Sequence, residues 1–295
     1  MKKYRLTTKE EFFHPIMSHV LPLFAFEGGD GIIGGTCVLV ANNFALTAKH
    51  VMEYIFEKFD IDISNSKKTP NVSLDVYILH AGTGHIWYVS QCFSWIGTDI
   101  MLLRLHPRSE STKKYISKRL GITVDPPKVG SEVTAIGYPF SEVLIHRNDD
   151  EMTKLGLTLK PTVSVGLVSE IYHSHRDMSL LKFPSFSVDA CFSAGMSGGA
   201  VFNEKKELCG LICAGLNENN EEGSFYSNAV SIWPSMIMPI TLNDDGKIPH
   251  GLEANKPYRV IDLARNGFIE VNGHERVTFF KHANGSDGVR LQRLG

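Results

Sequence analysis

Three short motifs contain residue types that can carry out nucleophilic chemistry. His50 follows a short apolar stretch, Asp99 opens the apolar run Ile100–Leu105, and Ser197 stands among three glycines in the segment Ser193–Gly199. A histidine can take the proton of a serine hydroxyl as that oxygen attacks a carbonyl carbon. A carboxylate beside the histidine holds the imidazole in one tautomer and stabilises its protonated form. Together, the motifs predict an activated serine.

The glycines around Ser197 add a second function. Glycine lets the backbone turn tightly and approach a bound molecule closely. The N–H groups of Gly195 and Ser197 can then point at one spot and bind a developing oxyanion. The segment also matches the G-x-S-x-G pattern of α/β-hydrolases, but no alternation of strands and helices surrounds it.

Each motif taken singly has a structural explanation. A lone histidine after a strand is more often structural than catalytic, and an aspartate before a strand is often a turn residue. A serine among glycines often marks a flexible turn. The order and spacing carry the argument: His50 and Asp99 are 99 − 50 = 49 residues apart, and Ser197 follows 197 − 99 = 98 residues later. A fold that joins them must bring its two halves together.

The elements that position these motifs are predicted to be short strands. The first half contains two hairpins and a buried strand, with strands at Thr36–Val40, Phe44–Thr47, Val72–Leu79, His85–Val89 and Ile100–Leu105. One short helix is predicted over His50–Phe59. The second half contains a further set, at Glu132–Gly137, Val163–Ile171, Phe186–Cys191, Ala200–Phe202, Leu208–Ala214 and Ser227–Ile232. Residues 106–128 between the halves are predicted to be a linker, and the polar stretch around Asn148–Glu151 an exposed loop.

The last 50 residues differ in pattern. Strands are predicted at Tyr258–Ile261, Gly267–Val271 and Val277–Lys281, with a hairpin turn at Asn272-Gly273. This tail is short for an independent domain. It is expected to pack on the second half or to serve as a docking element.

Composition limits the partners and the compartment. The formal net charge of −2 over 295 residues argues against a nucleic-acid partner. No run of about 18 apolar residues predicts a membrane span, and no apolar stretch follows the N-terminal lysines as in a signal peptide. Five cysteines, an odd number without paired spacing, favour a reducing compartment. The predicted location is therefore the cytoplasm.

No cofactor or metal is predicted. The chain has no CxxC pair and no compact cluster of histidine and cysteine. His173 and His175 could lie on one side of a strand, but no third ligand stands at a recognisable spacing. They are interpreted as surface histidines.

The motifs and strands together resemble a known family. The matching stretches are Gly35–Leu39, Leu46–Val51, Thr98–Leu105, Ala135–Phe140, Val163–Glu170, Val188–Phe202 and Gly210–Gly215. Over roughly residues 20–240, the chain resembles the trypsin-like (chymotrypsin-fold) serine peptidases. It is nearer to the bacterial Deg/HtrA-type and glutamyl-endopeptidase branches than to the digestive enzymes.

The resemblance implies an all-β fold of two six-stranded antiparallel barrels, with the active site in the cleft between them. It implies an N-terminal extension over residues 1–20 and a peptidase domain over 21–240. Within that domain the first barrel covers about 21–107, the linker about 108–128 and the second barrel about 129–240. A short C-terminal extension, expected to be β-rich, covers 241–295.

The resemblance also implies the roles of individual residues. His50, Asp99 and Ser197 form the catalytic triad of a serine endopeptidase, and Gly195 and Ser197 form the oxyanion hole. Cys191 lies at the base of the primary specificity pocket, and Cys213, Ala214 and Gly215 lie along one wall. Because no acidic residue occupies the base, the expected substrate is a protein or peptide with an uncharged residue before the cut.

One departure from the family concerns activation. Met196 stands where the digestive enzymes carry the acidic residue that binds a freshly cut N-terminus, so no such activation is expected. Control by a regulatory protein partner, by oligomerisation or by an upstream signal is expected instead, through residues 1–30 or 246–295. Two alternatives stay open on the same fold, a peptide-binding pseudoprotease and an esterase.

Overall fold

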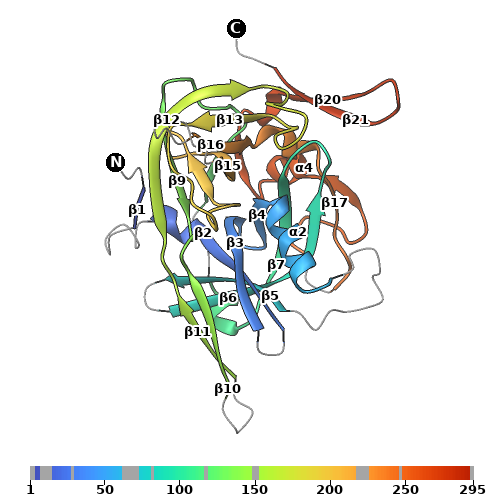
Figure 1. The fold of residues 1–295 in the computed structure, drawn as a ribbon. Coiled ribbons are helices and arrows are strands. Elements are labelled where there is room, and N and C mark those ends of the chain that lie inside the picture. Colours follow the sequence, from blue (N-terminus) through green and yellow to red (C-terminus); the bar gives the residue numbers. More distant parts are fainter. Residues whose placement is uncertain are drawn as a thin grey trace.

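The computed structural model describes residues 4–6, 15–27, 30–61, 73–80, 83–115, 119–147, 153–216, 226–245 and 248–292. Strands dominate these residues, and none of their helices is long and apolar enough to cross a bilayer. Figure 1 shows the N-terminal half (blue to cyan) below the second half (green to orange), with the C-terminal segment (red) beside them.

Six strands of the first half close into a barrel. They are β2 (Val20–Glu27), β3 (Asp30–Ala41), β4 (Phe44–Ala48), β5 (Ser73–His80), β6 (Thr83–Ser94) and β7 (Ile100–Pro107). The barrel order is β2-β3-β4-β7-β6-β5, with antiparallel pairing throughout. The predicted hairpin around Asn42-Asn43 joins β3 to β4, and the predicted helix is α2 (Lys49–Lys58).

Strand β4, strand β7 up to its last residue, and residues 35–40 of β3 are buried on both faces. Successive side chains of a strand point to opposite faces. On β4, Ala45 lies in the interior of the first barrel, whereas Phe44 and Leu46 join a second core that continues into the other half of the chain. On β7, Leu103 lies in the interior of the first barrel and Leu102 lies in the second core. Each such buried side chain contributes about 1.5–3 kcal/mol relative to exposure, so this shared core joins the two halves firmly.

Six further strands form a second closed ring, which confirms the predicted pair of six-stranded barrels. They are β9 (Glu132–Gly137), β12 (Thr162–Tyr172), β13 (Ser185–Val188), β14 (Ala200–Phe202), β15 (Leu208–Leu216) and β16 (Tyr226–Ser231). The path β14-β9-β12-β13-β16-β15 closes because β14 also pairs with β15. The predicted bounds of β9 and β14 match residue for residue.

Several elements outside the two rings were not predicted. The hairpin of β10 (Glu142–Arg147) and β11 (Thr153–Thr158) extends below the body in Figure 1. The centre of the predicted exposed loop, residues 148–152, lies outside the described residues. The other elements are β1 (Tyr4–Leu6), η1 (Pro15–His19), α3 (Glu110–Lys113) and β8 (Gly121–Thr123). The last two lie in the predicted linker, so that linker is partly regular.

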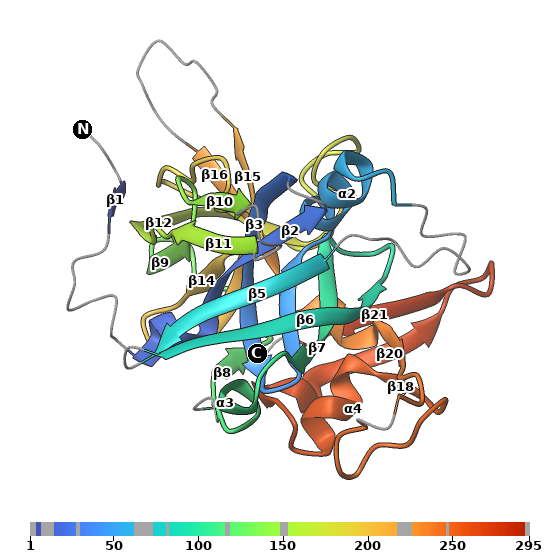
Figure 2. The same ribbon diagram turned by 90° about the horizontal axis from the view of Figure 1, so that it is seen from below.

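The C-terminal segment contacts the linker strand β8, and in Figure 2 it lies beside β6 and β7 of the first barrel. After η2 (Trp233–Ile237) it contains β17 (Pro239–Thr241), β18 (Pro257–Arg259), α4 (Val260–Arg265), β19 (Glu270–Asn272), η3 (His274–Arg276), β20 (Val277–Lys281) and β21 (Asp287–Leu291). Strand β19 pairs in parallel with β8, and Val260, Ile261 and Leu263 join the shared core.

Two predictions for this segment were wrong. The expected strand over Tyr258–Ile261 ends at Arg259, because Val260 begins a helix whose apolar residues face the shared core. The expected hairpin turn at Asn272-Gly273 leads into η3, because β19 finds its partner in the linker strand β8. Strand β20 was predicted to the residue.

A buried arginine joins the C-terminal segment to the first barrel. Arg104 on β7 has a side chain only 1% exposed, and its guanidinium donates to Gln91 Oε1 at 2.7 Å and to the carbonyl of Asn243 at 3.1 Å. It also donates to Asp245 Oδ1 at 2.9 Å, while Oδ2 of the same carboxylate lies 2.9 Å from His106 Nε2. The C-terminal segment therefore contacts the first barrel through polar bonds as well as through the shared apolar core.

We expect Asp245→Ala to lower the free energy of unfolding by about 1–3 kcal/mol, because it removes a charge-assisted bond to a buried cation. Asp245 is about one-third exposed (34%), so water can replace it in part. Urea denaturation measures the effect. The control is Asp244→Ala, which removes the neighbouring exposed carboxylate and should change stability by less than about 0.5 kcal/mol. Equal losses in both variants would contradict a specific role for Asp245.

Candidate active site

Backbone pairing brings His50 and Asp99 together. Strand β4 ends at Ala48, which pairs with Ile100 at the start of β7, so the residues that follow β4 lie beside those that precede β7. The N–H of Lys49 donates to the carbonyl of Asp99 at 2.7 Å, and the N–H of His50 donates to Asp99 Oδ1 at 3.1 Å. These two backbone N–H hydrogen bonds hold the first turn of α2 against Asp99 independently of the contact between the two side chains.

The side chains of His50 and Asp99 then form a direct hydrogen bond. His50 Nδ1 lies 2.7 Å from Asp99 Oδ2. The imidazole is 41% exposed and the carboxylate 10%. A carboxylate that accepts from Nδ1 leaves Nε2 of the neutral ring as an acceptor. Nε2 is therefore the atom of His50 that can take a proton.

Local charges set the proton affinity of His50. Burial lowers the pKa of the imidazole, but the hydrogen bond and charge of Asp99, together with the charge of Glu53, outweigh burial and raise it above its usual value. Glu53 lies one helical turn along α2 and pairs with Lys49 at 3.2 Å. His50 is thus a stronger base than a solvent-exposed histidine.

Cys213 approaches the same carboxylate from the second barrel. Its Sγ donates to Asp99 Oδ2 at 3.1 Å. Burial and the charge of Asp99 raise the pKa of this thiol well above its usual value, so it stays protonated and acts as a donor. The sequence interpretation put Cys213 in a pocket wall. The structure turns its thiol toward Asp99, a contact for which the sequence gives no local signal.

The loop of Ser197 leaves two N–H groups unused. Gly195 adopts a positive φ of 89°, and the Met196 carbonyl accepts the N–H of Gly199 at 2.8 Å. In a trans peptide the N–H points opposite to the preceding carbonyl, so the Ser197 N–H faces away from Gly199. Within the described residues, neither Gly195 N–H nor Ser197 N–H donates a hydrogen bond. Both are available to an oxyanion.

Thr36 on β3 connects this loop to the first barrel. Its N–H donates to the Ser197 carbonyl at 2.9 Å, and its hydroxyl donates to the Gly195 carbonyl at 3.2 Å. The same hydroxyl accepts the N–H of Tyr138 at 3.0 Å. Gly198 has a φ of 79°, and a Cβ there would lie 2.2 Å from the Thr36 carbonyl oxygen. Only glycine fits such an approach, which places the serine loop against the strands that lead to His50.

The described residues include no hydrogen bond between Ser197 and His50. The structure thus contains the contact of His50 with Asp99 that the sequence predicts and leaves the contact of Ser197 with His50 open. In proteins without a bound substrate, catalytic hydrogen bonds are often long or poorly aligned, and they tighten when the substrate binds.

The predicted pocket residues lie on two neighbouring segments. Cys191 is partly buried, and Ser227 Oγ fixes the residues on either side of it, donating to the Ala190 carbonyl at 2.8 Å and accepting the Phe192 N–H at 2.9 Å. Ala214 and Gly215 on β15 pair with β16. Residues 217–225, which follow β15, lie outside the described part of the chain, so the role of these residues as a pocket stays a prediction.

His50, Asp99 and Cys213 also have the spacing of a metal site, because one ligand atom of each lies within 4.8 Å of the others. Two observations favour the hydrogen-bonded arrangement. The Cys213 thiol has a raised pKa, whereas a metal binds the thiolate. Asp99 Oδ2 already accepts from both neighbours.

Comparison with known families gives one match. A family profile described as a trypsin-like peptidase domain matches residues 35–211, more than half of the chain and all three of the motifs above. A search of curated proteins finds no match.

Solved structures of similar fold are distant in sequence. An inactive mutant of Rv3671c from M. tuberculosis H37Rv is 13% identical, with a TM-score of 0.41 over 73% of this chain and 82% of that one. The MamO protease domain from Magnetospirillum magneticum is 17% identical, with a TM-score of 0.42 over 74% and 94%. The HtrA-type protease AlgW with a tripeptide is 18% identical, with a TM-score of 0.45 over 72% of this chain and 56% of that one.

We expect Asp99→Asn to lower the pKa of His50 below its usual value, because burial persists while the raising charge is lost. Glu53→Gln should lower it by a smaller amount. An NMR pH titration of the His50 ring protons measures both shifts. Glu57→Gln removes an exposed carboxylate from the same helix and serves as the control. An unchanged His50 pKa in Asp99→Asn would contradict this electrostatic account.

Proposed function

The chain belongs to the trypsin-like peptidase family, and we propose that it is a serine endopeptidase whose catalytic triad is His50, Asp99 and Ser197. The observation that carries the proposal is the 2.7 Å hydrogen bond from His50 Nδ1 to Asp99 Oδ2. This bond fixes the tautomer that makes Nε2 a proton acceptor.

In the proposed reaction, Ser197 Oγ attacks a peptide carbonyl while His50 Nε2 takes its proton. The imidazolium that forms is stabilised by Asp99, and His50 then gives the proton to the leaving amine. A water molecule, deprotonated by His50, hydrolyses the acyl-enzyme and restores Ser197. The raised pKa of His50 supports the role of base. Because this pKa is raised, His50 becomes protonated at a higher pH than an unperturbed histidine. Activity should therefore fall at a higher pH when the solution is acidified.

The developing negative charge falls on the carbonyl oxygen of the substrate. The unused N–H groups of Gly195 and Ser197 are the proposed donors to this oxygen. Such donors act strongly because they are already oriented, and the loss of one typically costs about 3 kcal/mol of transition-state stabilisation. Thr36 contributes indirectly, because it holds the carbonyls of both of these residues.

The proposed substrate is a protein or peptide with an uncharged residue before the cut. The partly buried thiol of Cys191 would form the base of the pocket, with Ala214 and Gly215 along one wall. The HtrA-type protease AlgW, which has a similar fold, was solved with a tripeptide and with a decapeptide. We also propose a cytoplasmic location, which the five free thiols of the described chain support. Control by a partner protein is proposed as well.

A peptide-binding protein without hydrolytic activity is the second candidate, and the open contact between Ser197 and His50 favours it. Such a protein would keep the cleft but leave its serine unactivated. An esterase on the same fold is distinguished by its turnover of esters in preference to peptides.

We expect a fluorophosphonate probe to label the wild-type protein and not Ser197→Ala, because only an activated serine attacks phosphorus at a useful rate. In-gel fluorescence and the mass of the modified peptide identify the labelled residue. Ser193→Ala, four residues earlier in the same loop, is the matched control and should label normally. If the wild type fails to label in the presence of unfolded protein substrate, the hydrolytic proposal fails and the binding protein is favoured.

We expect Thr36→Val to reduce kcat with a smaller change in KM. Valine keeps the shape of threonine but cannot donate to the Gly195 carbonyl or accept the N–H of the buried Tyr138. The loss of these bonds costs about 1–3 kcal/mol, which corresponds to roughly 5- to 150-fold in rate where it disturbs the oxyanion donors. Peptide hydrolysis kinetics measure it, and Thr36→Ser, which keeps the hydroxyl, should restore most of the rate. A normal kcat in Thr36→Val would contradict the role of Thr36.

A further inference from the structure

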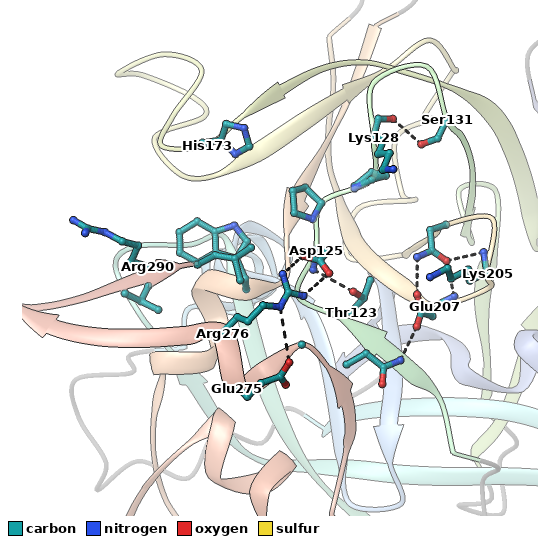
Figure 3. Close-up of a pocket in the computed structure, with 18 of the residues that line it drawn as sticks. Thr123, Asp125, Lys128, Ser131, His173, Lys205, Glu207, Glu275, Arg276 and Arg290 are labelled. Carbon is teal, nitrogen blue, oxygen red and sulfur yellow. Dashed lines mark hydrogen bonds and ion pairs between the residues drawn. The ribbon is translucent and has the colours of Figure 1, made fainter. Parts of the chain in front are cut away.

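A cavity of about 1290 Å³ lies apart from the catalytic residues. Its walls come from residues 123–131 at the end of the linker and before β9, from the turn Asn203–Glu207 between β14 and β15, and from the C-terminal hairpin β20–β21. None of His50, Asp99 and Ser197 lines it. Figure 3 shows the ion pair of Asp125 and Arg276 at the centre, with His173 on a separate loop across the opening.

The carboxylates of the cavity are already engaged. Asp125 receives two hydrogen bonds from Arg276, of which Nη1 to Oδ1 measures 2.7 Å. Glu207 accepts from Asn203 Nδ2 at 2.9 Å and from Asn272 Nδ2 at 2.6 Å. Two further carboxylates have weaker contacts, Glu204 with the N–H of Glu132 at 3.3 Å and Glu275 with Arg276 Nε at 3.9 Å. The acidic side chains therefore offer little to a ligand.

Three cations of the cavity have no such partner. Lys128, Lys205 and Arg290 are exposed, and no carboxylate of the described chain lies within ion-pair distance of them. The guanidinium of Arg290 lies over the ring of Phe280, 5.5 Å from its centroid. The unused charge of the cavity is therefore positive, which favours an anionic group.

The hairpin adds apolar surface and an open strand edge. Val289 and Leu291 belong to the apolar face that packs with the core around Trp233, whereas Arg290 points to the opposite face. Residues from both faces of β21 line the cavity, so the cavity reaches the edge of this strand. Within the described residues β21 pairs only with β20, so its outer edge keeps unpaired main-chain groups. An extended peptide can add to such an edge.

We propose that this cavity binds an extended acidic segment of a partner protein. The main chain of the segment runs along β21, its carboxylates meet Lys128, Lys205 and Arg290, and its apolar side chains cover Val289 and Phe280. A nucleic acid fits less well, because it has no peptide main chain that can pair with the open edge of β21. The inference rests on the cavity alone and holds whether or not Ser197 is active.

The test uses the full chain carrying Ser197→Ala, which binds peptides without cleaving them. A display library of random dodecapeptides is selected on this protein, and a fluorescein-labelled copy of the most enriched peptide is titrated by anisotropy. We expect enrichment of Asp and Glu beside apolar residues. The triple variant Lys128→Glu, Lys205→Glu, Arg290→Glu should raise the Kd at least about tenfold.

The matched control changes net charge equally at exposed positions outside the cavity, through Lys58→Glu, Lys114→Glu and Arg119→Glu. This control should leave the Kd unchanged. In a separate measurement on the protein with an intact cavity, bound peptide should slow amide hydrogen exchange in Asp287–Leu291. The proposal is overturned if the selected peptides are not acidic, if neither triple variant weakens binding (as for a peptide in the catalytic cleft), or if both weaken it equally. It is also overturned if a single-stranded oligonucleotide binds through the three cations and the peptides do not.

Discussion

The bond between Thr36 and the serine loop is the constraint on which the candidate site depends. His50 and Asp99 belong to the first barrel and Ser197 to the second, so their geometry is only as fixed as the junction between the barrels. Thr36 holds two carbonyls of the loop, and Gly198 lies so close that a Cβ would collide with the Thr36 carbonyl. The shared apolar core behind this contact keeps the barrels from sliding.

That shared core explains which parts of the fold could be predicted from the sequence. Strand β7 stood out as an apolar run because its two faces serve two different cores. The hairpin β10–β11 escaped notice because it lies outside both rings and carries exposed residues such as Glu142. Val260 and Ile261 suggested a strand because they are β-branched. Tertiary packing overrode that propensity, and Asp262, whose side chain accepts the N–H of Arg259 at 2.8 Å, was the local signal for a helix start.

The candidate site also has a part that the sequence predicts and a part that only the structure shows. The order of His50, Asp99 and Ser197, with glycines around the serine, was enough to nominate them, because each needs a particular local backbone. The contact of Cys213 with Asp99 joins residues 114 positions apart across the barrel junction, and only the register of β15 decides it. Sequence reasoning can therefore nominate the candidate residues, but it does not find a distant contact such as that of Cys213 with Asp99.

The hairpin β14–β15 connects the candidate site to the cavity beside the C-terminal segment. Strand β14 begins three residues after Ser197, and β15 carries Cys213 to Asp99, so both sides of the candidate site are built on one hairpin. Its turn, Asn203–Glu207, is also a wall of the cavity beside the C-terminal segment. Strands β14 and β15 are hydrogen-bonded to each other, and every residue of β14 is buried. We therefore expect the two strands to move as a unit. A displacement of the turn would reach Ser197 and the contact with Asp99 together, because the same packed strands support both.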